Sequence, residues 1–379
     1  MYAHANIYPV KNYPLFKNNP INRIQIGLLL LLSFSASNVS AQKSTILYYT
    51  MADFTAVKKF DVHIHINTSQ TAFIEQAQKD NFKFLDIVDD RPFGLPMEGQ
   101  QKIAVADLLQ FPSQMEFATT FSVKDWNDPN WVSNTITDLK HSFANGAKAV
   151  KIWKNIGMDL RDKDGKFVMI DNPRIDSIIS YLEQNNIPLI GHNGEPKDCW
   201  LPLDKMLFDK EYYAGHPQYY MYLHPEYPSY NDQINARDNM LKKHPHLKFV
   251  GAHLGSLEWS LTELAKRLDE FPNMCVDLSR MPELHYHALK DWQKTHDFFI
   301  KYQDRLLYGT DNAINQTNNP QEIQKSTHEE WLSDWQFFVT DTPIMLPGFG
   351  KLKGLRLPKQ VIDKIYYQNA QRWLYGSAY

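Results

Sequence analysis

Cysteine is scarce in this chain, since only Cys199 and Cys275 occur among its 379 residues. We place these two residues far apart around the fold and therefore expect two free thiols rather than a disulfide. The chain also has no large excess of charge of either sign, because 40 Lys and Arg against 43 Asp and Glu leave a formal net charge of −3. That near-neutral balance gives no electrostatic case for binding nucleic acid or an anionic membrane surface.

Apolar character is limited in the first forty residues as well, where the run at residues 26–32 is too short to span a bilayer. Lys11, Lys17 and Arg23 precede this run, and small and polar residues follow it as far as Ala41. The pattern predicts a secretory signal peptide over residues 1–41, cleaved after Ala41. With no cysteine near the cleavage site to carry a lipid, we expect an exported, periplasmic protein with no membrane association after cleavage.

Short apolar segments alternate with amphipathic ones along residues 42–379. The predicted strands lie at residues 59–66, 82–90, 115–121, 149–153, 188–192, 247–253, 274–278 and 306–311. The predicted helices lie at residues 70–80, 98–110, 129–144, 173–184, 232–243, 259–270, 287–301 and 359–374. This alternation implies right-handed parallel crossovers, and eight such units close naturally into an α/β fold of the (β/α)8 TIM-barrel type. An open doubly wound sheet is the alternative, but no glycine-rich phosphate-binding turn follows any strand.

Two long insertions interrupt the alternation, one from residue 193 to about 230 after the fifth strand and one over residues 312–358 after the eighth. The first is rich in tyrosine, and we interpret it either as an aromatic flap over the barrel mouth or as a loop packed around its own small core. Glu195 follows the fifth strand closely and is a candidate pocket residue. Arg237, on the helix behind the flap, could bind an anionic group of a substrate or form an ion pair with a nearby acid.

Nitrogen and oxygen donors gather at the ends of the predicted strands. Residues i and i+2 of a strand point to the same face, so His63 and His65 aim at one spot, and Asp61 shares their parity as a further ligand or an outer partner. In a (β/α)8 barrel the active site lies at the C-terminal ends of the strands. The strand ends that meet there carry His63, His65, Lys151, His192, His253 and Asp311. Imidazoles and a carboxylate suit a divalent ion such as zinc, so the joint pattern predicts a metal site.

Each of these residues also has a purely structural alternative. His192 could be satisfied by backbone groups of its loop, and His253 or Asp311 could cap a following helix. Lys151 could form a structural ion pair. Their coincidence at one rim of one barrel favours the metal site over four separate structural roles.

Five motifs, spread over nearly the whole predicted mature chain, resemble those of the amidohydrolase superfamily. They are Asp61-Val-His63-Ile-His65, Gly191-His192, Val250-Gly-Ala-His253-Leu-Gly255, Leu307-Tyr-Gly-Thr-Asp311 and Asn369-Ala-Gln-Arg372. The closest likeness is to the amidohydrolase-related (amidohydrolase 2) branch, which includes aminocarboxymuconate semialdehyde decarboxylase, resorcylate-type decarboxylases and lactone hydrolases. The resemblance implies a zinc-type ion held by His63, His65, His192 and Asp311, with His253 beside it as acid, base or substrate contact.

Lys151 leaves the number of ions open. In superfamily members with two metals, a lysine at the end of the fourth strand is carboxylated and bridges the ions, and Lys151 lies in that strand. The single-metal branch generally has no such bridge, and Lys151 would then be an ammonium group that binds a substrate carboxylate. We predict one Zn²⁺ per chain, with Mn²⁺ or a two-metal site bridged by carboxylated Lys151 as alternatives.

The chemistry of these residue types favours a metal-dependent hydrolase that acts on a lactone, ester or amide bond of a small anionic substrate. The ion would activate a water and polarise a carbonyl group, and Asp311 would accept the proton of that water. A non-oxidative decarboxylase of the same branch is the alternative enzyme, and a barrel that binds ligand without turnover is the third hypothesis. The expected partner is a small molecule; the sequence leaves the oligomeric state open, with a homodimer as one option.

Overall fold

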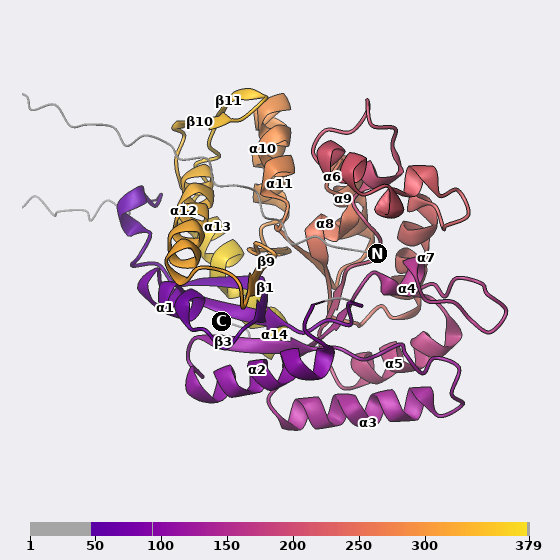
Figure 1. Cartoon of the computed structure of the whole chain (residues 1–379). Helices are drawn as coiled ribbons and strands as arrows, with labels where there is room; N and C mark the ends of the chain where they lie inside the picture. The colour runs from indigo at the N-terminus through magenta and orange to yellow at the C-terminus, as the bar shows by residue number, and fades with distance from the viewer. Residues whose placement is uncertain (1–46, 93, 377–379) are drawn as a thin grey trace, which may run out of the picture.

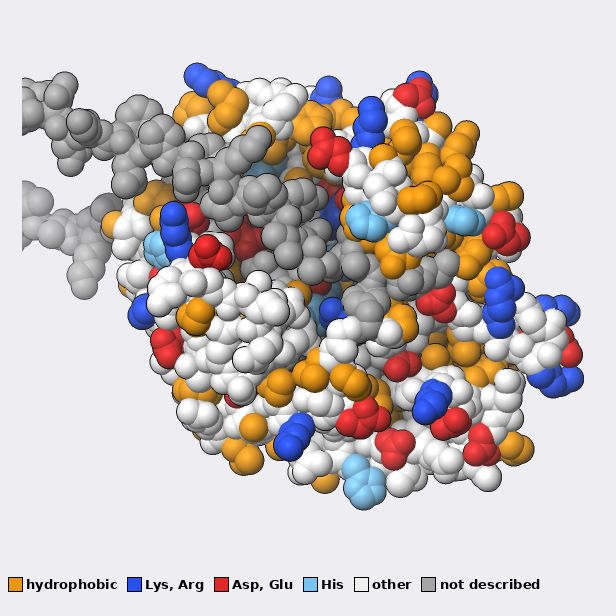
Figure 2. Space-filling model, viewed as in Figure 1, with side chains coloured by type: hydrophobic (Ala, Val, Ile, Leu, Met, Phe, Trp, Pro, Cys, Tyr) orange, Lys and Arg blue, Asp and Glu red, His pale blue; other side chains and the backbone are white. Residues whose placement is uncertain are grey.

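The computed structural model describes residues 47–92 and 94–376, and the predicted signal peptide over residues 1–41 lies outside them. Within these two ranges, none of the helices combines the length and the apolar character that crossing a bilayer requires. Basic and acidic side chains are interspersed over the face seen in Figure 2, in keeping with the small net charge.

Nine parallel strands form the central sheet, in the order β8-β7-β6-β5-β4-β3-β2-β1-β9. Their bounds are β1 (Lys59–Asn67), β2 (Phe82–Ile87), β3 (Met115–Thr119), β4 (Ala149–Ile152), β5 (Leu189–Gly191), β6 (Phe249–Gly251), β7 (Met274–Asp277), β8 (Leu306–Leu307) and β9 (Asn312–Asn315). The chain between β8 and β9 joins the two edges, because the Val62 N–H donates to the Tyr308 carbonyl (2.9 Å) and the Asp311 N–H to the His63 carbonyl (2.8 Å). These bonds confirm the predicted (β/α)8 barrel.

Helices alternate with the strands and surround the barrel (Figure 1). The outer helices are α1 (Ala72–Lys79), α2 (Met97–Gln110), α3 (Trp131–Ala144), α5 (Pro173–Gln184), α7 (Tyr230–Lys243), α9 (Leu261–Glu270), α10 (Met281–Lys290), α11 (Trp292–Lys301), α12 (Pro320–Val339), α13 (Lys359–Asp363) and α14 (Asn369–Tyr375). Short turns are η1 (Met51–Asp53), α4 (Asn155–Met158), η2 (Lys197–Trp200), α6 (Lys210–Gly215), η3 (Pro217–Tyr219), η4 (Met221–Leu223), α8 (Ala252–Ser256) and the π-helical turn η5 (Lys364–Gln368).

The barrel interior is filled by apolar side chains, most of them small or branched, that alternate along the strands. They include Phe60, Val62, Leu85, Ile87, Ala118, Ala149, Ile190, Val250 and Leu307, all nearly inaccessible to solvent. Trp373 and Leu374 of α14 belong to the same cluster. A larger apolar layer lies between the strands and the helices.

The predicted helix over residues 287–301 is wrong in both its start and its continuity. Two helices occupy the region, and Asp291 ends α10 and caps α11, its side chain accepting the Lys294 N–H (3.0 Å). The helix also begins earlier than predicted, at Met281, with Pro282 in its first turn. An aspartate that favours an N-cap over a helix interior accounts for the break.

The insertion over residues 312–358 is largely regular structure rather than loop. It holds β9, the 20-residue helix α12 and the antiparallel hairpin of β10 (Pro343–Leu346) and β11 (Gly350–Lys353). Asn319 caps α12 by accepting the N–H groups of Gln321 and Glu322, with proline at the first helical position. The hairpin reaches the first insertion, where the ring of Phe349 stacks on Phe208 with centroids 5.5 Å apart.

The first insertion packs around a small apolar core that it shares with the segment after β4. The cluster comprises Cys199, Met206, Tyr213, Tyr220 and Met221 of the insertion and Trp153 and Met158 of that segment. The packed-loop interpretation therefore holds for Tyr213 and Tyr220, which are buried. Cys199 in this cluster and Cys275 in β7 are both free thiols.

Helix α12 is joined to the first strand through Trp331, which is completely buried. Its indole stacks on Phe82 with centroids 3.9 Å apart and donates its N–H to Asp61 (3.1 Å). We expect Trp331→Ala to lower the free energy of unfolding by about 3–5 kcal/mol, as measured by chemical denaturation, because it removes a large buried side chain. Leu109→Ala, at a residue 80% exposed on α2, is the control and should change stability by less than about 0.5 kcal/mol. Equal effects of the two substitutions would contradict this account.

Candidate metal centre

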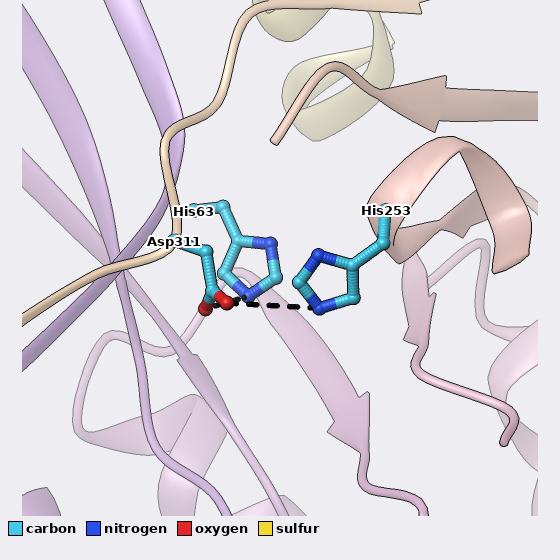
Figure 3. A group of neighbouring side chains, drawn as sticks. All are labelled: His63, His253 and Asp311. Carbon is cyan, nitrogen blue, oxygen red and sulfur yellow. Dashed lines mark ion pairs between the residues drawn. The ribbon is translucent and has the colours of Figure 1, made fainter. Parts of the chain in front are cut away.

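The barrel brings four polar side chains from three strand ends to one point. Asp311 lies at the centre, with Oδ1 3.1 Å from His63 Nε2 and 3.3 Å from His65 Nε2, and Oδ2 3.7 Å from His253 Nε2. Figure 3 shows His63, His253 and Asp311 directed at one another, and their ligand atoms lie within 4.8 Å of each other. All four residues are at least nine-tenths buried.

His192 and Lys151 complete the cluster that the sequence predicts. The His192 ring lies 4.4 Å from the His253 ring between centroids, and its buried Nε2 has no hydrogen-bond partner within the described residues. Lys151 Nζ lies 3.3 Å from His63 Nε2, with the side chain 1% exposed. The structure thus places all six predicted rim residues together.

Hydrogen bonds at Nδ1 fix the orientation of three of the imidazoles. His63 Nδ1 bonds to Asp277 (2.8 Å), His65 Nδ1 to the Ile87 carbonyl (2.8 Å) and His253 Nδ1 to the Ser279 hydroxyl (2.9 Å). The Asp277 carboxylate and the Ile87 carbonyl can only accept a hydrogen bond. The Ser279 hydroxyl donates its proton to Asp277 (2.6 Å) and so accepts from His253, and each of the three imidazoles therefore donates from Nδ1. Each Nε2 therefore carries a lone pair, the arrangement that metal-binding histidines adopt.

Burial and the neighbouring charges set the protonation states. Burial raises the pKa of Asp311, but His63 and His253 outweigh it and hold that pKa well below its usual value. Burial lowers the pKa of His65, lowers that of His253 to about 3 and lowers that of His192 well below its usual value. Burial and the Lys151 charge also lower the pKa of His63, but the charges of Asp311 and Asp277 outweigh them, so the pKa of His63 alone among these histidines is raised. The cluster thus offers an ionised carboxylate at Asp311 and neutral imidazoles at His65, His192 and His253, the states that a metal ion requires, whereas an ion would have to displace a proton from His63.

A small cavity opens beside the cluster. It is lined by His65, Asp89, Arg91, Lys151, Trp153, Lys154, His192 and Asp311. Its volume of about 30 Å³ exceeds the ~10–15 Å³ that one water needs by the same measure. Ion pairs hold two of the lining cations, Arg91 with Asp89 and Lys154 with Glu195.

Two residues predicted to bind substrate lie elsewhere. Glu195 is 1% exposed and bonds to Lys154 from behind the cavity wall. Arg237 does not line the cavity; its guanidinium donates to the Gly255 carbonyl and to Asp238. Asp61 has the outer role that was one of its two options, because it accepts from Thr310 (2.7 Å) and Trp331.

Sequence reasoning missed three residues of this site. Asp277 ends β7 and also accepts the His253 N–H (2.8 Å), so it orients two of the histidines. Asp89 and Arg91 follow β2, with Asp89 3.4 Å from His65 Nδ1. The signal was available, because all three follow apolar strands at the same rim as the predicted ligands.

The donor set fits a divalent transition metal. Such an ion needs imidazole Nε2 atoms and a carboxylate directed at one point, and His63, His65 and Asp311 provide them together with the unpartnered Nε2 of His192. The groups that bond to the Nδ1 atoms, Asp277 and the Ile87 carbonyl, hold the imidazoles in place from outside. Without an ion, the buried nitrogen of His192 would cost free energy.

Solved structures with a similar fold share little sequence identity with this chain. An uncharacterized TIM-barrel protein from Bordetella bronchiseptica is 14% identical with a TM-score of 0.50, covering 84% of this chain and 98% of its own. A dihydroxybenzoic acid decarboxylase from Polaromonas sp. JS666, with bound manganese and 2-nitroresorcinol, is 12% identical with a TM-score of 0.50, covering 85% and 98%. A probable 2-pyrone-4,6-dicarboxylic acid hydrolase from Acinetobacter baumannii is 13% identical with a TM-score of 0.47, covering 85% and 100%.

At these identities the first two likenesses show the barrel fold alone. No curated protein matches the chain. A family model described as amidohydrolase does match, over residues 125–375, which is well over half of the sequence. That segment includes Lys151, His192, His253 and Asp311, and the chain therefore belongs to the amidohydrolase family.

Proposed function

We propose that this amidohydrolase is a metal-dependent hydrolase that cleaves a lactone, ester or amide bond in a small anionic substrate. The observation that carries the proposal is the set of histidine Nε2 atoms directed at an ionised Asp311 inside a buried cavity. His63, His65, His192 and Asp311 would hold one Zn²⁺, with Mn²⁺ or two ions bridged by carboxylated Lys151 as alternatives. When bound, the ion would polarise the substrate carbonyl and lower the pKa of a water.

The two oxygens of Asp311 have different surroundings. Oδ1 contacts His63 and His65, which the proposal assigns to the ion, while Oδ2 lies on the side of His253. Oδ2 is therefore placed to accept the proton of the attacking water and to return it to the leaving group. His253 is held by Asp277 at its backbone and by Ser279 at Nδ1, and its Nε2 is placed to bind the substrate oxygen as charge develops.

The cavity wall supports an anionic and planar substrate. Arg91, Lys151 and Lys154 all line it, and Asp89 and Asp311 are the only acids that do so among the described residues. Burial lowers the pKa of Lys151, and the nearby charges of Asp277 and Asp311 act in the opposite direction by favouring its charged form. Trp153 adds a flat apolar surface on which a ring could stack. The same tryptophan favours the second candidate, a decarboxylase acting on a carboxylated ring.

Substitution of the central carboxylate tests the mechanism. We expect Asp311→Asn to lower turnover by at least ~10²–10⁴-fold, because the proton acceptor is lost, while circular dichroism shows an intact fold. Asp269→Asn, which removes an exposed partner of Lys301, is the matched control and should retain activity. Near-normal turnover by Asp311→Asn would rule out the mechanism; unchanged ligand affinity, with no turnover by the unsubstituted protein, would favour a binding protein.

Isotope labelling separates the two enzyme hypotheses. We expect reaction of 2-pyrone-4,6-dicarboxylate, a lactone probe, in H₂¹⁸O to place one ¹⁸O atom in the product, measured by mass spectrometry. A dihydroxybenzoate serves as the decarboxylation probe. Release of carbon dioxide without uptake of labelled oxygen would assign the protein to the decarboxylases instead.

A cavity cation tests the substrate class. We expect Arg91→Gln to raise KM by about 10–100-fold for the probe that is turned over, equivalent to ~1.4–2.8 kcal/mol, with kcat changed much less. Arg174→Gln is the control, because Arg174 lies on α5 and does not line the cavity. Its guanidinium lies 5.0 Å from the centre of the Trp126 ring. An unchanged KM in Arg91→Gln would show that the anion binds elsewhere.

A further inference from the structure

The residues that follow β6 form a left-handed turn, labelled α8 in Figure 1. His253, Leu254, Gly255 and Ser256 have φ values of 56°, 58°, 65° and 56°. Left-handed backbone is unfavourable for L-amino acids because Cβ approaches the following carbonyl oxygen, and three of the four residues are not glycine. Such a turn persists only where surrounding contacts hold it, and it often lies at a functional site.

This turn determines where His253 points. It folds back on its own strand so closely that a Cβ at Gly251 would lie 2.6 Å from the Gly255 Cα. The close approach brings the His253 N–H to Asp277 (2.8 Å) and the His253 Nε2 to within 3.7 Å of Asp311. A relaxed turn would carry the imidazole away from the centre.

Two side chains of α7 hold the carbonyl groups of the turn. Arg237 donates from Nη1 to the Gly255 carbonyl, and the Tyr230 hydroxyl donates to the Ser256 carbonyl. Arg237 is 1% exposed, and Asp238 fixes its guanidinium by accepting from Nε (3.0 Å) and Nη2 (2.7 Å). A buried charged donor with this orientation stabilises one turn geometry more strongly than a neutral group would.

Helix α7 also connects the turn to the rest of the barrel mouth. It begins directly after the first insertion, with Ser229 as its cap and Asp232 completing the capping box. Gln233 donates to the Gly157 carbonyl (2.7 Å) beyond β4, and Trp259 donates to the Tyr230 hydroxyl (2.7 Å). One helix face therefore contacts both the loop after β4 and the loop after β6.

We propose that Arg237, assisted by Tyr230, is a positioning residue that holds the left-handed turn at His253–Ser256 and thereby aims His253 at Asp311. Of the two sequence-based options for Arg237, the ion pair with a nearby acid is present, since its guanidinium pairs with Asp238 (2.7 Å), and the role proposed here adds the contact with the turn. Its consequence for catalysis rests on the proposed function, whereas its effect on the turn does not.

Hydrogen–deuterium exchange tests the turn directly. We expect Arg237→Ala to accelerate exchange of the amides in residues 252–257 by at least tenfold, and Arg237→Lys to do so less. Arg267→Gln is the matched control, because Arg267 contacts the same Asp238 (3.3 Å) from α9 but pairs with Glu263. Unchanged exchange over residues 252–257 in folded Arg237→Ala would overturn the proposal.

A second variant covers the case in which Arg237→Ala does not fold. Tyr230→Phe removes only the hydroxyl that bonds to Ser256 and Trp259, and it should accelerate exchange in the same segment. The proposal is wrong if neither Tyr230→Phe nor Arg237→Lys alters that segment.

Activity provides an independent readout. We expect Arg237→Ala to lower kcat by about 10–100-fold with little change in KM, and millimolar guanidinium chloride, but not sodium chloride, to restore part of it. Gly251→Ala should lower kcat without rescue, because it displaces the turn while the arginine remains. If Arg237→Ala exchanges faster but the unsubstituted protein hydrolyses no probe, the proposed function is rejected and this inference stands. If the unsubstituted protein hydrolyses a probe but exchange in Arg237→Ala is unchanged, this inference is rejected and the proposed function stands.

Discussion

The contact between Asp311 and the imidazoles around it is the interaction on which the rest of the site depends. A buried carboxylate is costly unless charge or hydrogen bonds compensate it. Here His63, His65 and His253 all approach Asp311 with Nε2, and each is turned that way by a hydrogen bond at Nδ1. The outer partners therefore determine what the centre can bind.

Closure of the barrel and assembly of the site occur at the same place. The Asp311 N–H bonds to the His63 carbonyl, so the bond that joins the last strand region to the first also places the carboxylate beside the first histidine. Asp61 reinforces this seam by accepting from Thr310 and from Trp331 of α12. The long helix of the second insertion thus supports the site from outside the barrel.

Local pattern in the sequence was enough to predict the parts of the site that depend on local structure. His63 and His65 share a face because strand parity requires it, and the rim position of His192 and Asp311 follows from parallel strands. The order of strands and helices was predictable for the same reason. The extra helix boundary at Asp291 and the helix α12 were missed, although Asp291 and Asn319-Pro320 are recognisable capping signals.

Contacts between distant segments could not be predicted. Asp277 bonds to a histidine 214 positions away, and nothing near it in the sequence marks that pairing. For Arg237 the sequence left open an anion site or an ion pair with a nearby acid, and the ion pair with Asp238 is present. Its second contact, with a left-handed turn, is revealed only by the backbone geometry. Residue type predicted the chemistry at the strand ends, and three-dimensional packing decided which side chains support it.

Anomalous X-ray diffraction from crystals grown with Zn²⁺ would locate the ion relative to Asp311 and its histidines. We expect one strong peak at about 2.0–2.2 Å from Nε2 atoms of the cluster and from an oxygen of Asp311. A peak away from these side chains, or none at full zinc occupancy in solution, would contradict this account.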